Sequence, residues 1–207
     1  MSCAVFLFLE EFFMRSSKIT TLSECAVMVA LAFALSYAKL FEMPLGGSVT
    51  VASMLPIMLI SIKYGNAIGV GTAFVYSLTQ LMQAFLSGNV FPYCQTREAL
   101  IACILFDYLV PFTLLGLSGA FKRMGIFKHR EISAYVGMAS VVVLRFLSHF
   151  ITGVVIWGQW APEGMGKYLY SFLYNGSFLG ADFAICLAMA VLMLRKQEIR
   201  KLINLDA

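Results

Sequence analysis

Four residues with distinct chemistry recur at every fourth position of one apolar stretch: Arg145, His149, Gly153 and Trp157. A helix places residues at this spacing on one face. Gly153 has no side chain, so a flat heteroaromatic ring can approach the backbone between the imidazole and the indole. The ring would stack on Trp157 and form hydrogen bonds deeper in the site. The pattern predicts a binding face for an aromatic ligand.

Two more polar side chains, Asp107 and Asn175, are expected at the depth of His149 in neighbouring apolar stretches. If these stretches are helices that cross a membrane, a rise of about 1.5 Å per residue places all three side chains roughly 10 to 12 Å below its outer surface. A carboxylate there suits a ligand with one positive charge and an amino-substituted ring. Tyr108 can donate its hydroxyl from the next position. The competing interpretation is a structural ion pair between Asp107 and Arg145.

An intramembrane enzyme would use His149 and Asp107 as an acid/base pair. The apolar stretches that we expect to cross the membrane contain no second histidine and no nucleophile paired with a base. The five cysteines form no CxxC or Cys/His spacing of a metal or redox site. The sequence therefore favours binding over catalysis, and it predicts no metal ion and no cofactor.

The composition requires a lipid environment for the elements that carry these residues. Of 207 residues, 60% are hydrophobic and 13% are charged, which is too little polar surface for a water-soluble globule. At roughly 20 residues per span, about six helices fit and no soluble catalytic domain remains. The net charge of +4 comes from basic residues at the ends of apolar stretches, so nucleic-acid binding is not favoured.

We therefore predict an all-α integral membrane protein with six transmembrane helices in one compact bundle. Residues 1–20 are expected to be an amphipathic or loosely ordered leader, 21–196 the six-helix membrane domain, and 197–207 a cytoplasmic tail. The second span is short and contains a proline, so a tilted or kinked helix is expected there. The predicted spans are Leu22–Ala38, Val51–Ile62, Ala67–Leu86, Leu100–Phe121, Ile132–Trp157 and Tyr168–Leu194.

Basic residues are distributed unevenly over the two sides of this six-span arrangement. The side opposite the main cluster has Lys39, Arg97 and Lys167. By the positive-inside rule, both termini should be cytoplasmic. The basic residues that fall on the predicted cytoplasmic side are Arg15, Lys18, Lys63, Lys122, Arg123, Lys128, Arg130, Arg195, Lys196, Arg200 and Lys201.

The first span has a stripe of small residues, Ala26, Ala30 and Ala34, at intervals of four. Small side chains let another helix approach closely in lipid, where packing replaces the hydrophobic driving force. By spacing alone, a contact inside the bundle and a docking surface for a partner are equally good interpretations.

Five stretches of the sequence form a recognisable set: Lys39–Thr50, Asp107-Tyr108, His149–Gly158, Ala161–Met165 and Leu169–Gly176. Together they resemble the thiamin-specific substrate-binding component of energy-coupling factor transporters. The resemblance extends from about residue 22 to 194, and its last two stretches are the most specific.

The resemblance implies a multi-pass protein of the bacterial plasma membrane, with six helices and cytoplasmic termini, that binds thiamin from outside with high affinity. It implies partners as well: a transmembrane coupling subunit and two ATPase subunits. The chain itself has no GxxxxGK[ST] loop, which agrees with an energy source in partner subunits. A relative of the same architecture that binds another vitamin, such as a thiamin precursor or riboflavin, is the alternative.

The resemblance also implies roles for individual residues. An acidic residue and a histidine hold the aminopyrimidine, which stacks on a tryptophan; these correspond to Asp107, His149 and Trp157. Tyr170 and Asn175 match further ligand-contacting positions.

Arg145 and Gly153 fall at positions that line the same pocket by this resemblance, and Tyr108 belongs to the Asp107-Tyr108 pair that carries it. The loop from Phe41 through Gly46 and Gly47 to Ser48 resembles a lid over the site, and the stripe of Ala26, Ala30 and Ala34 resembles the surface that docks the coupling subunit. Two departures stand out. Leu109-Val110-Pro111 follows Asp107-Tyr108 where the family often has proline at once, and the lid has no tryptophan, so stacking from the lid would need Phe41.

Overall fold

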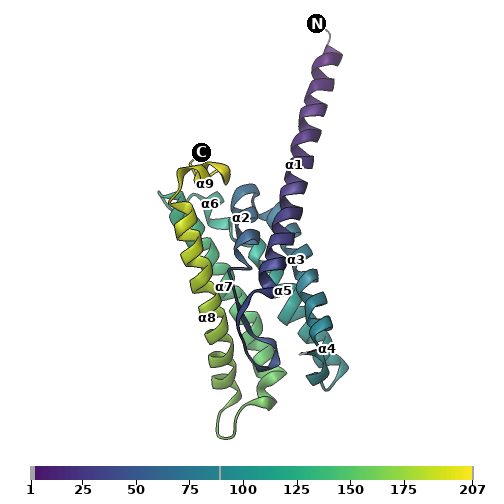
Figure 1. The fold of residues 1–207 in the computed structure, drawn as a ribbon, viewed down its shortest axis with the longest axis vertical. Coiled ribbons are helices and arrows are strands. Elements are labelled where there is room, and N and C mark those ends of the chain that lie inside the picture. The colour runs from purple at the N-terminus through teal and green to yellow at the C-terminus, as the bar shows by residue number, and fades with distance from the viewer. Residues whose placement is uncertain (1–2, 89, 207) are drawn as a thin grey trace.

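The computed structural model describes residues 3–88 and 90–206, with side chains described from residue 17 onward. Most of the described chain is helical, and the helices run side by side in one bundle (Figure 1). The elements in chain order are α1 (Cys3–Tyr37), β1 (Lys39–Glu42), η1 (Pro44–Gly46), β2 (Ser48–Thr50), α2 (Leu55–Tyr64), α3 (Asn66–Ser87), η2 (Phe91–Tyr93), α4 (Arg97–Cys103), η3 (Ile104–Leu109), α5 (Val110–Thr113), η4 (Leu114–Leu117), α6 (Ala120–Met124), α7 (Arg130–Val155), η5 (Trp157–Trp160), α8 (Lys167–Leu194) and α9 (Gln197–Leu202).

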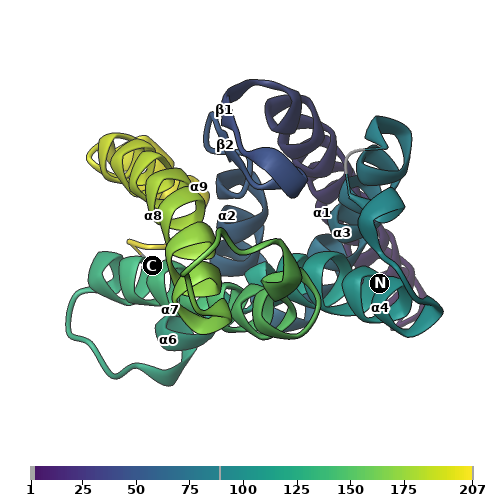
Figure 2. The ribbon, with the colours of Figure 1, turned by 90° about the horizontal axis from the view of Figure 1, so that it is seen from below.

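Four helical stretches of the described chain are long and apolar enough to cross a membrane: Ser17–Tyr37, Arg97–Met124, Arg130–Val155 and Lys167–Leu194. α3 has 22 residues and α2 has 10. Every residue of α2 from Leu55 to Ile62 is buried. An apolar helix that is buried on all sides belongs in the core of a bundle, and α2 lies there when the molecule is viewed along its length (Figure 2).

The second predicted span begins later than expected. Residues 51–54 are not helical, because β2 ends at Thr50 and Ala52 adopts a left-handed φ of 56°. α2 begins at Leu55 with Pro56 in its first turn, where the missing N–H of proline costs no hydrogen bond.

The fourth predicted span, Leu100–Phe121, is not one regular α-helix. It runs from Arg97 to Met124 as α4, a π-helical turn (η3), α5, a 3-10 turn (η4) and α6. Pro111 has no N–H to donate, and its ring would clash with the carbonyl of Asp107 in a regular α-helix. The wider π turn directly before α5 accommodates this proline.

The segment between α1 and α2 contains strands, which the all-α prediction did not include. β1 and β2 pair antiparallel, with Phe41 opposite Val49 and Glu42 opposite Ser48. The hairpin turns at Leu45 and Gly46, whose φ angles are 66° and 96°. This hairpin is the predicted lid, and we refer to residues 39–50 as the lid hairpin.

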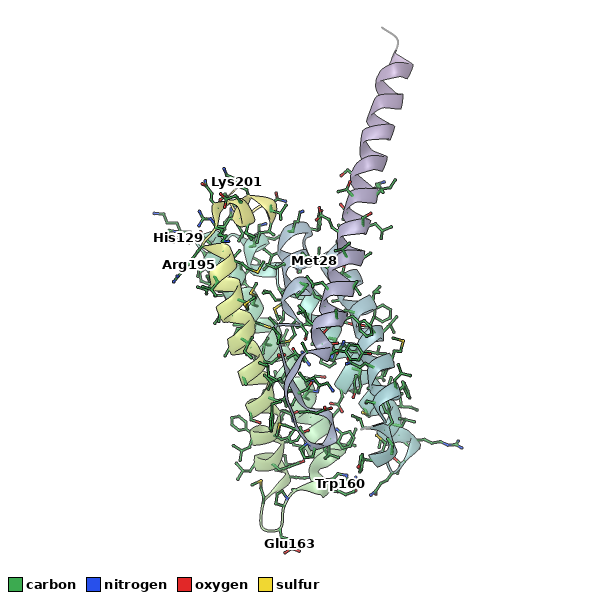
Figure 3. All side chains as sticks on the ribbon, viewed as in Figure 1. Met28, His129, Trp160, Glu163, Arg195 and Lys201 are labelled. Atoms are coloured by element: carbon green, nitrogen blue, oxygen red, sulfur yellow. The ribbon has the colours of Figure 1, made fainter. Side chains whose placement is uncertain are left out.

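The two ends of the bundle differ in charge. The N-terminus, α6 and α9 lie at one end, together with His129, Arg195 and Lys201, whereas Trp160 and Glu163 lie at the other end (Figure 3). The segment predicted as a leader is described from Cys3 as the start of α1. The predicted tail forms α9, and its Ile203 and Leu205 are buried in the main core.

Candidate ligand-binding site

A cavity of about 130 Å³ lies between the lid hairpin, α1, α3, η3, α7 and α8. About 10 to 15 Å³ is enough for one water molecule, so this cavity has room for an organic ligand. The structure brings together all eight predicted binding residues around it, and their role in binding stays a prediction. They are Asp107, Tyr108, Arg145, His149, Gly153, Trp157, Tyr170 and Asn175.

Asp107 is the centre of a hydrogen-bond network at this cavity. Its Oδ1 lies 3.1 Å from His149 Nδ1 and accepts a hydrogen bond from Thr152 Oγ1. Its Oδ2 accepts a hydrogen bond of 2.9 Å from Trp157 Nε1. Asp107 and Tyr108 both line the cavity from the π-helical turn η3, an irregularity that is frequent at functional sites. The carboxylate is therefore held in one orientation by three side chains.

Trp157 reaches this network from outside the helix that was predicted to carry it. α7 ends at Val155, and Trp157 begins the 3-10 turn η5. The helix cannot continue far, because Pro162 disfavours a helical residue before it. The prediction that Trp157 shares a helical face with His149 is wrong, although the indole still lines the same cavity.

Arg145 does not pair with Asp107 in the part of the chain that the structure describes, so the predicted ion pair is not formed. Its Nη1 lies 2.7 Å from Met54 Sδ, and its guanidinium lies 4.1 Å from the centre of the Phe112 ring. Its Nε donates to His149 Nε2 at 3.4 Å. Because Nε2 acts as the acceptor, the imidazole proton belongs on Nδ1, which donates it to Asp107.

Asn175 fixes α8 against α7 beside the imidazole. Its Nδ2 donates to the carbonyl of His149 at 3.1 Å and to the carbonyl of Ser171 at 3.0 Å. A Cβ on Gly153 would lie 2.9 Å from Asn175 Nδ2 and still closer to Ser171 Oγ. The space above Gly153 is therefore filled by α8. Gly153 itself lines the cavity, so the approach of a ligand to its backbone from another side stays a prediction.

The lid hairpin is attached to α8 at two points. At its turn, Tyr174 Oη accepts a hydrogen bond of 3.0 Å from Gly47 N and donates one to the carbonyl of Pro44. At its base, Asp182 Oδ1 accepts hydrogen bonds of 2.9 and 2.8 Å from the N and Oγ1 of Thr50. Asp182 is buried and does not line the cavity, which agrees with the structural role expected for it.

The predicted lid residues do not all contribute to the cavity. Gly46, Gly47 and Ser48 line it, whereas Phe41 is 61% exposed and does not. In an antiparallel hairpin, successive side chains point to opposite faces, and Phe41 lies on the outer face. The lid therefore supplies no aromatic stacking partner.

Sequence reasoning missed a second group of polar residues at the cavity: Ser36 from α1 with Gln80 and Gln83 from α3. The available signal was a pair of amides three residues apart within an apolar span. It also missed Thr152, which lies three residues after His149 and donates to Asp107.

The alanine stripe of α1 faces away from the bundle. Ala26, Ala30 and Ala34 are exposed, whereas Ala32 and Ser36 on the other face are buried. The interpretation of the stripe as a contact inside the bundle is therefore wrong.

Comparison with known proteins adds a family to this geometry. The family model described as Thiamine transporter protein (Thia_YuaJ) matches residues 22–202. The chain is 31% identical over 188 residues to the thiamine transporter ThiT of Bacillus subtilis, covering 86% of this chain and 92% of the relative. It is 25% identical over 191 residues to ThiT of Lacticaseibacillus paracasei, covering 86% and 87%.

A solved structure of ThiT from Listeria monocytogenes matches the fold with a TM-score of 0.65 at 22% identity. The match covers 88% of this chain and 98% of that one, so the two share their architecture nearly end to end. The chain therefore belongs to the thiamine transporter protein family, and it is a transport protein rather than an enzyme.

Proposed function

We propose that this chain is the thiamin-binding subunit of an energy-coupling factor importer in the bacterial plasma membrane. It captures thiamin from outside and hands it inward together with a transmembrane coupling subunit and two ATPase subunits. The single observation that carries this proposal is the carboxylate of Asp107, oriented by His149, Thr152 and Trp157 at the wall of a cavity. The names of the two ThiT relatives support the same ligand.

The chemistry of the cavity suits thiamin, which joins an aminopyrimidine to a positively charged thiazolium ring. A carboxylate accepts hydrogen bonds from the amino group and attracts the cation. The indole of Trp157 offers a face for stacking. Arg145 is turned toward Met54 and the Phe112 ring, so its charge is not directed at the cation.

We further propose six spans with both termini in the cytoplasm, in which α2 and α3 complete the four long apolar stretches. The basic residues support this orientation, because Arg195 and Lys201 lie at the end of the bundle that also holds both termini (Figure 3). In this orientation the lid hairpin lies toward the outer end of the bundle. There it covers the cavity that receives the ligand from outside.

Binding is tested with the protein purified in detergent and titrated with thiamin in the absence of ATP. We expect binding of one thiamin per chain, with quenching of tryptophan fluorescence because Trp157 lines the cavity. Riboflavin and biotin serve as controls. No response to thiamin together with clear binding of another vitamin would contradict the proposal and assign the chain to a different ligand.

Coupling to partners is tested separately through the alanine stripe. Ala30 is exposed on α1, whereas the cavity wall on that helix is formed by Ser36. Ala30→Trp should block the close approach of a partner helix while leaving the cavity intact. Thiamin binding by the purified variant should survive and uptake by cells should fall sharply. Normal uptake would mean that the stripe does not dock the coupling subunit.

A further inference from the structure

The cavity has a second polar wall, which is built from α1 and α3, whereas the Asp107 network comes from η3, α7 and η5. Gln80 Nε2 donates to Ser36 Oγ at 3.2 Å, and Ser36 Oγ lies 3.1 Å from Gln83 Oε1. Ser36 is only 3% exposed, and its hydroxyl also lies 2.7 Å from the carbonyl of Phe33. All three side chains line the cavity. The serine therefore orients two amides at its wall.

These amides keep part of their hydrogen-bonding capacity for a ligand. A glutamine amide offers two N–H donors and one carbonyl acceptor. Within residues 3–88 and 90–206, Gln83 Nε2 and Gln80 Oε1 have no hydrogen-bond partner. Neither atom is fully buried, and both residues line the cavity. The wall thus presents a free donor and a free acceptor a few residues apart on one helix.

The charge of this wall differs from that of the Asp107 wall. Its three members are neutral, and the ammonium of Lys39, which also lines the cavity, already pairs with Glu42 at 2.8 Å. A group that both donates and accepts hydrogen bonds but carries no charge is the best match for such a wall. A hydroxyl meets this description, whereas a second cation or a phosphate would find no free opposite charge there.

We propose that Ser36, Gln80 and Gln83 form a second subsite that binds a hydroxyl group at the end of the ligand away from Asp107. This inference rests on the proposed function. In thiamin the group is the hydroxyl of the hydroxyethyl substituent on the thiazolium ring, which projects away from the aminopyrimidine. The subsite makes Gln80 and Gln83 determinants of ligand specificity, separate from the residues that hold the aromatic rings.

The test compares thiamin with an analogue that has an ethyl group in place of the hydroxyethyl group. Both ligands are titrated by calorimetry against the wild-type protein, Gln83→Met and Gln80→Met. Wild type should prefer thiamin about tenfold, since the analogue leaves an amide unpaired in a closed cavity. In Gln83→Met the preference should fall to about one, because thiamin binds more weakly and the analogue binds as before.

Met82→Leu is the matched control, since Met82 lies next to Gln83 on α3 and is 48% exposed on the outer surface. It should keep the tenfold preference. Binding of the analogue shows directly that a variant is folded, and Gln80→Met provides the same comparison if Gln83→Met binds neither ligand.

Two results would overturn the subsite: equal affinity of wild type for both ligands, or a preference that survives in both glutamine variants. The failure of the proposed function looks different, because wild type would then bind neither thiamin nor its analogue, and the subsite would fall with it.

Discussion

The two halves of the bundle use small and polar residues for opposite purposes. In the half near α6 and α9, glycines bring backbones into direct contact: a Cβ on Gly116 would clash with the backbone of Gly69, and one on Gly137 would clash with the carbonyl of Ser118. In the half near the lid hairpin, polar side chains from several helices surround a cavity. The first half is closed by packing, and the second is kept open for a ligand.

Hydrogen bonds follow the same division. Ser61 Oγ donates to the carbonyl of Gly116 at 2.5 Å and accepts from Gly119 N at 2.9 Å, so it joins α2 to the helical stretch Arg97–Met124. Lys122 Nζ donates to the carbonyls of Ile62 and Ile203, which ties α9 to the end of α2. Each of these bonds joins a side chain of one element to the backbone of another. Around the cavity, by contrast, the hydrogen bonds that Asp107 forms within residues 3–88 and 90–206 come from side chains.

Stability and affinity should therefore depend on different regions of the bundle. Substitutions in the closed half would push apart backbones that are already in contact, and no flexible side chain can move aside there. They should therefore lower the stability of the folded protein. Substitutions at the cavity remove groups that already border empty space, so they should act on ligand binding and leave folding nearly unchanged.

The largest expected effect is that of Gly116→Val on stability. The added side chain would meet the backbone of Gly69 and Val70, which cannot move aside without separating α3 from the helical stretch Arg97–Met124. The free energy of unfolding should fall by about 3 kcal/mol or more, as for severe overpacking. The change is measured as thermal stability in detergent.

Gly71→Val is the control for this substitution, because Gly71 lies on α3 and no atom lies within 4 Å of its added Cβ. It should behave as wild type. If both variants were equally stable, the closed half would not depend on its backbone contacts and the division between the two halves would not hold.

The next effect is that of Trp157→Ala on affinity. The variant loses a stacking face worth about 1 kcal/mol beyond burial, and it leaves Oδ2 of Asp107 without its hydrogen bond from the indole. Thiamin affinity should fall at least tenfold, at about 1.4 kcal/mol per factor of ten. Calorimetry is the suitable measurement, because the variant also loses the fluorescent reporter. Trp160→Ala, at the partly exposed neighbour in η5, should have little effect.

Asp107→Asn tests the charge at the centre of the network. The shape is kept and the negative charge is lost, so thiamin should bind about tenfold more weakly, as expected for a hydrogen bond to a charged group. A neutral analogue without the cationic ring should lose much less. Equal losses for both ligands would mean that Asp107 serves the hydrogen bonds of the ring and not as a counter-ion.

The sequence was sufficient to predict the polar layer but not the backbone that presents it. The spacing of Arg145, His149 and Gly153 indicated one face of α7, and a residue rise of about 1.5 Å placed Asp107 and Asn175 at the same depth. These inferences need only helical periodicity, which is a local property of the chain.

The features that were missed depend on contacts between distant segments. The space above Gly153 is occupied by α8, and the exposure of Phe41 depends on the pairing of β1 with β2. The π turn before Pro111 is the exception, because it relieves a clash within one helix and not between distant segments. No periodicity in the sequence encodes which of several segments fills a space, so these details required the folded structure.

The smallest expected effect is that of Tyr174→Phe on the lid hairpin. The hydroxyl of Tyr174 is bonded to Gly47 N and to the carbonyl of Pro44, while the ring packs near Phe178, so the variant loses two hydrogen bonds and keeps the packing. The base of the hairpin stays attached through Thr50 and Asp182.

Because only the turn is loosened, we expect the two lost hydrogen bonds to contribute about 0.5 kcal/mol each, at the low end for such bonds. Thiamin should then dissociate about fivefold faster, with unchanged thermal stability. The dissociation rate is measured by displacing bound, labelled thiamin with an excess of unlabelled thiamin. Tyr168→Phe on the same helix is the control, since Tyr168 is 63% exposed. Should Tyr174→Phe lower stability as much as Gly116→Val, the lid would belong to the closed half and the contrast between the regions would fail.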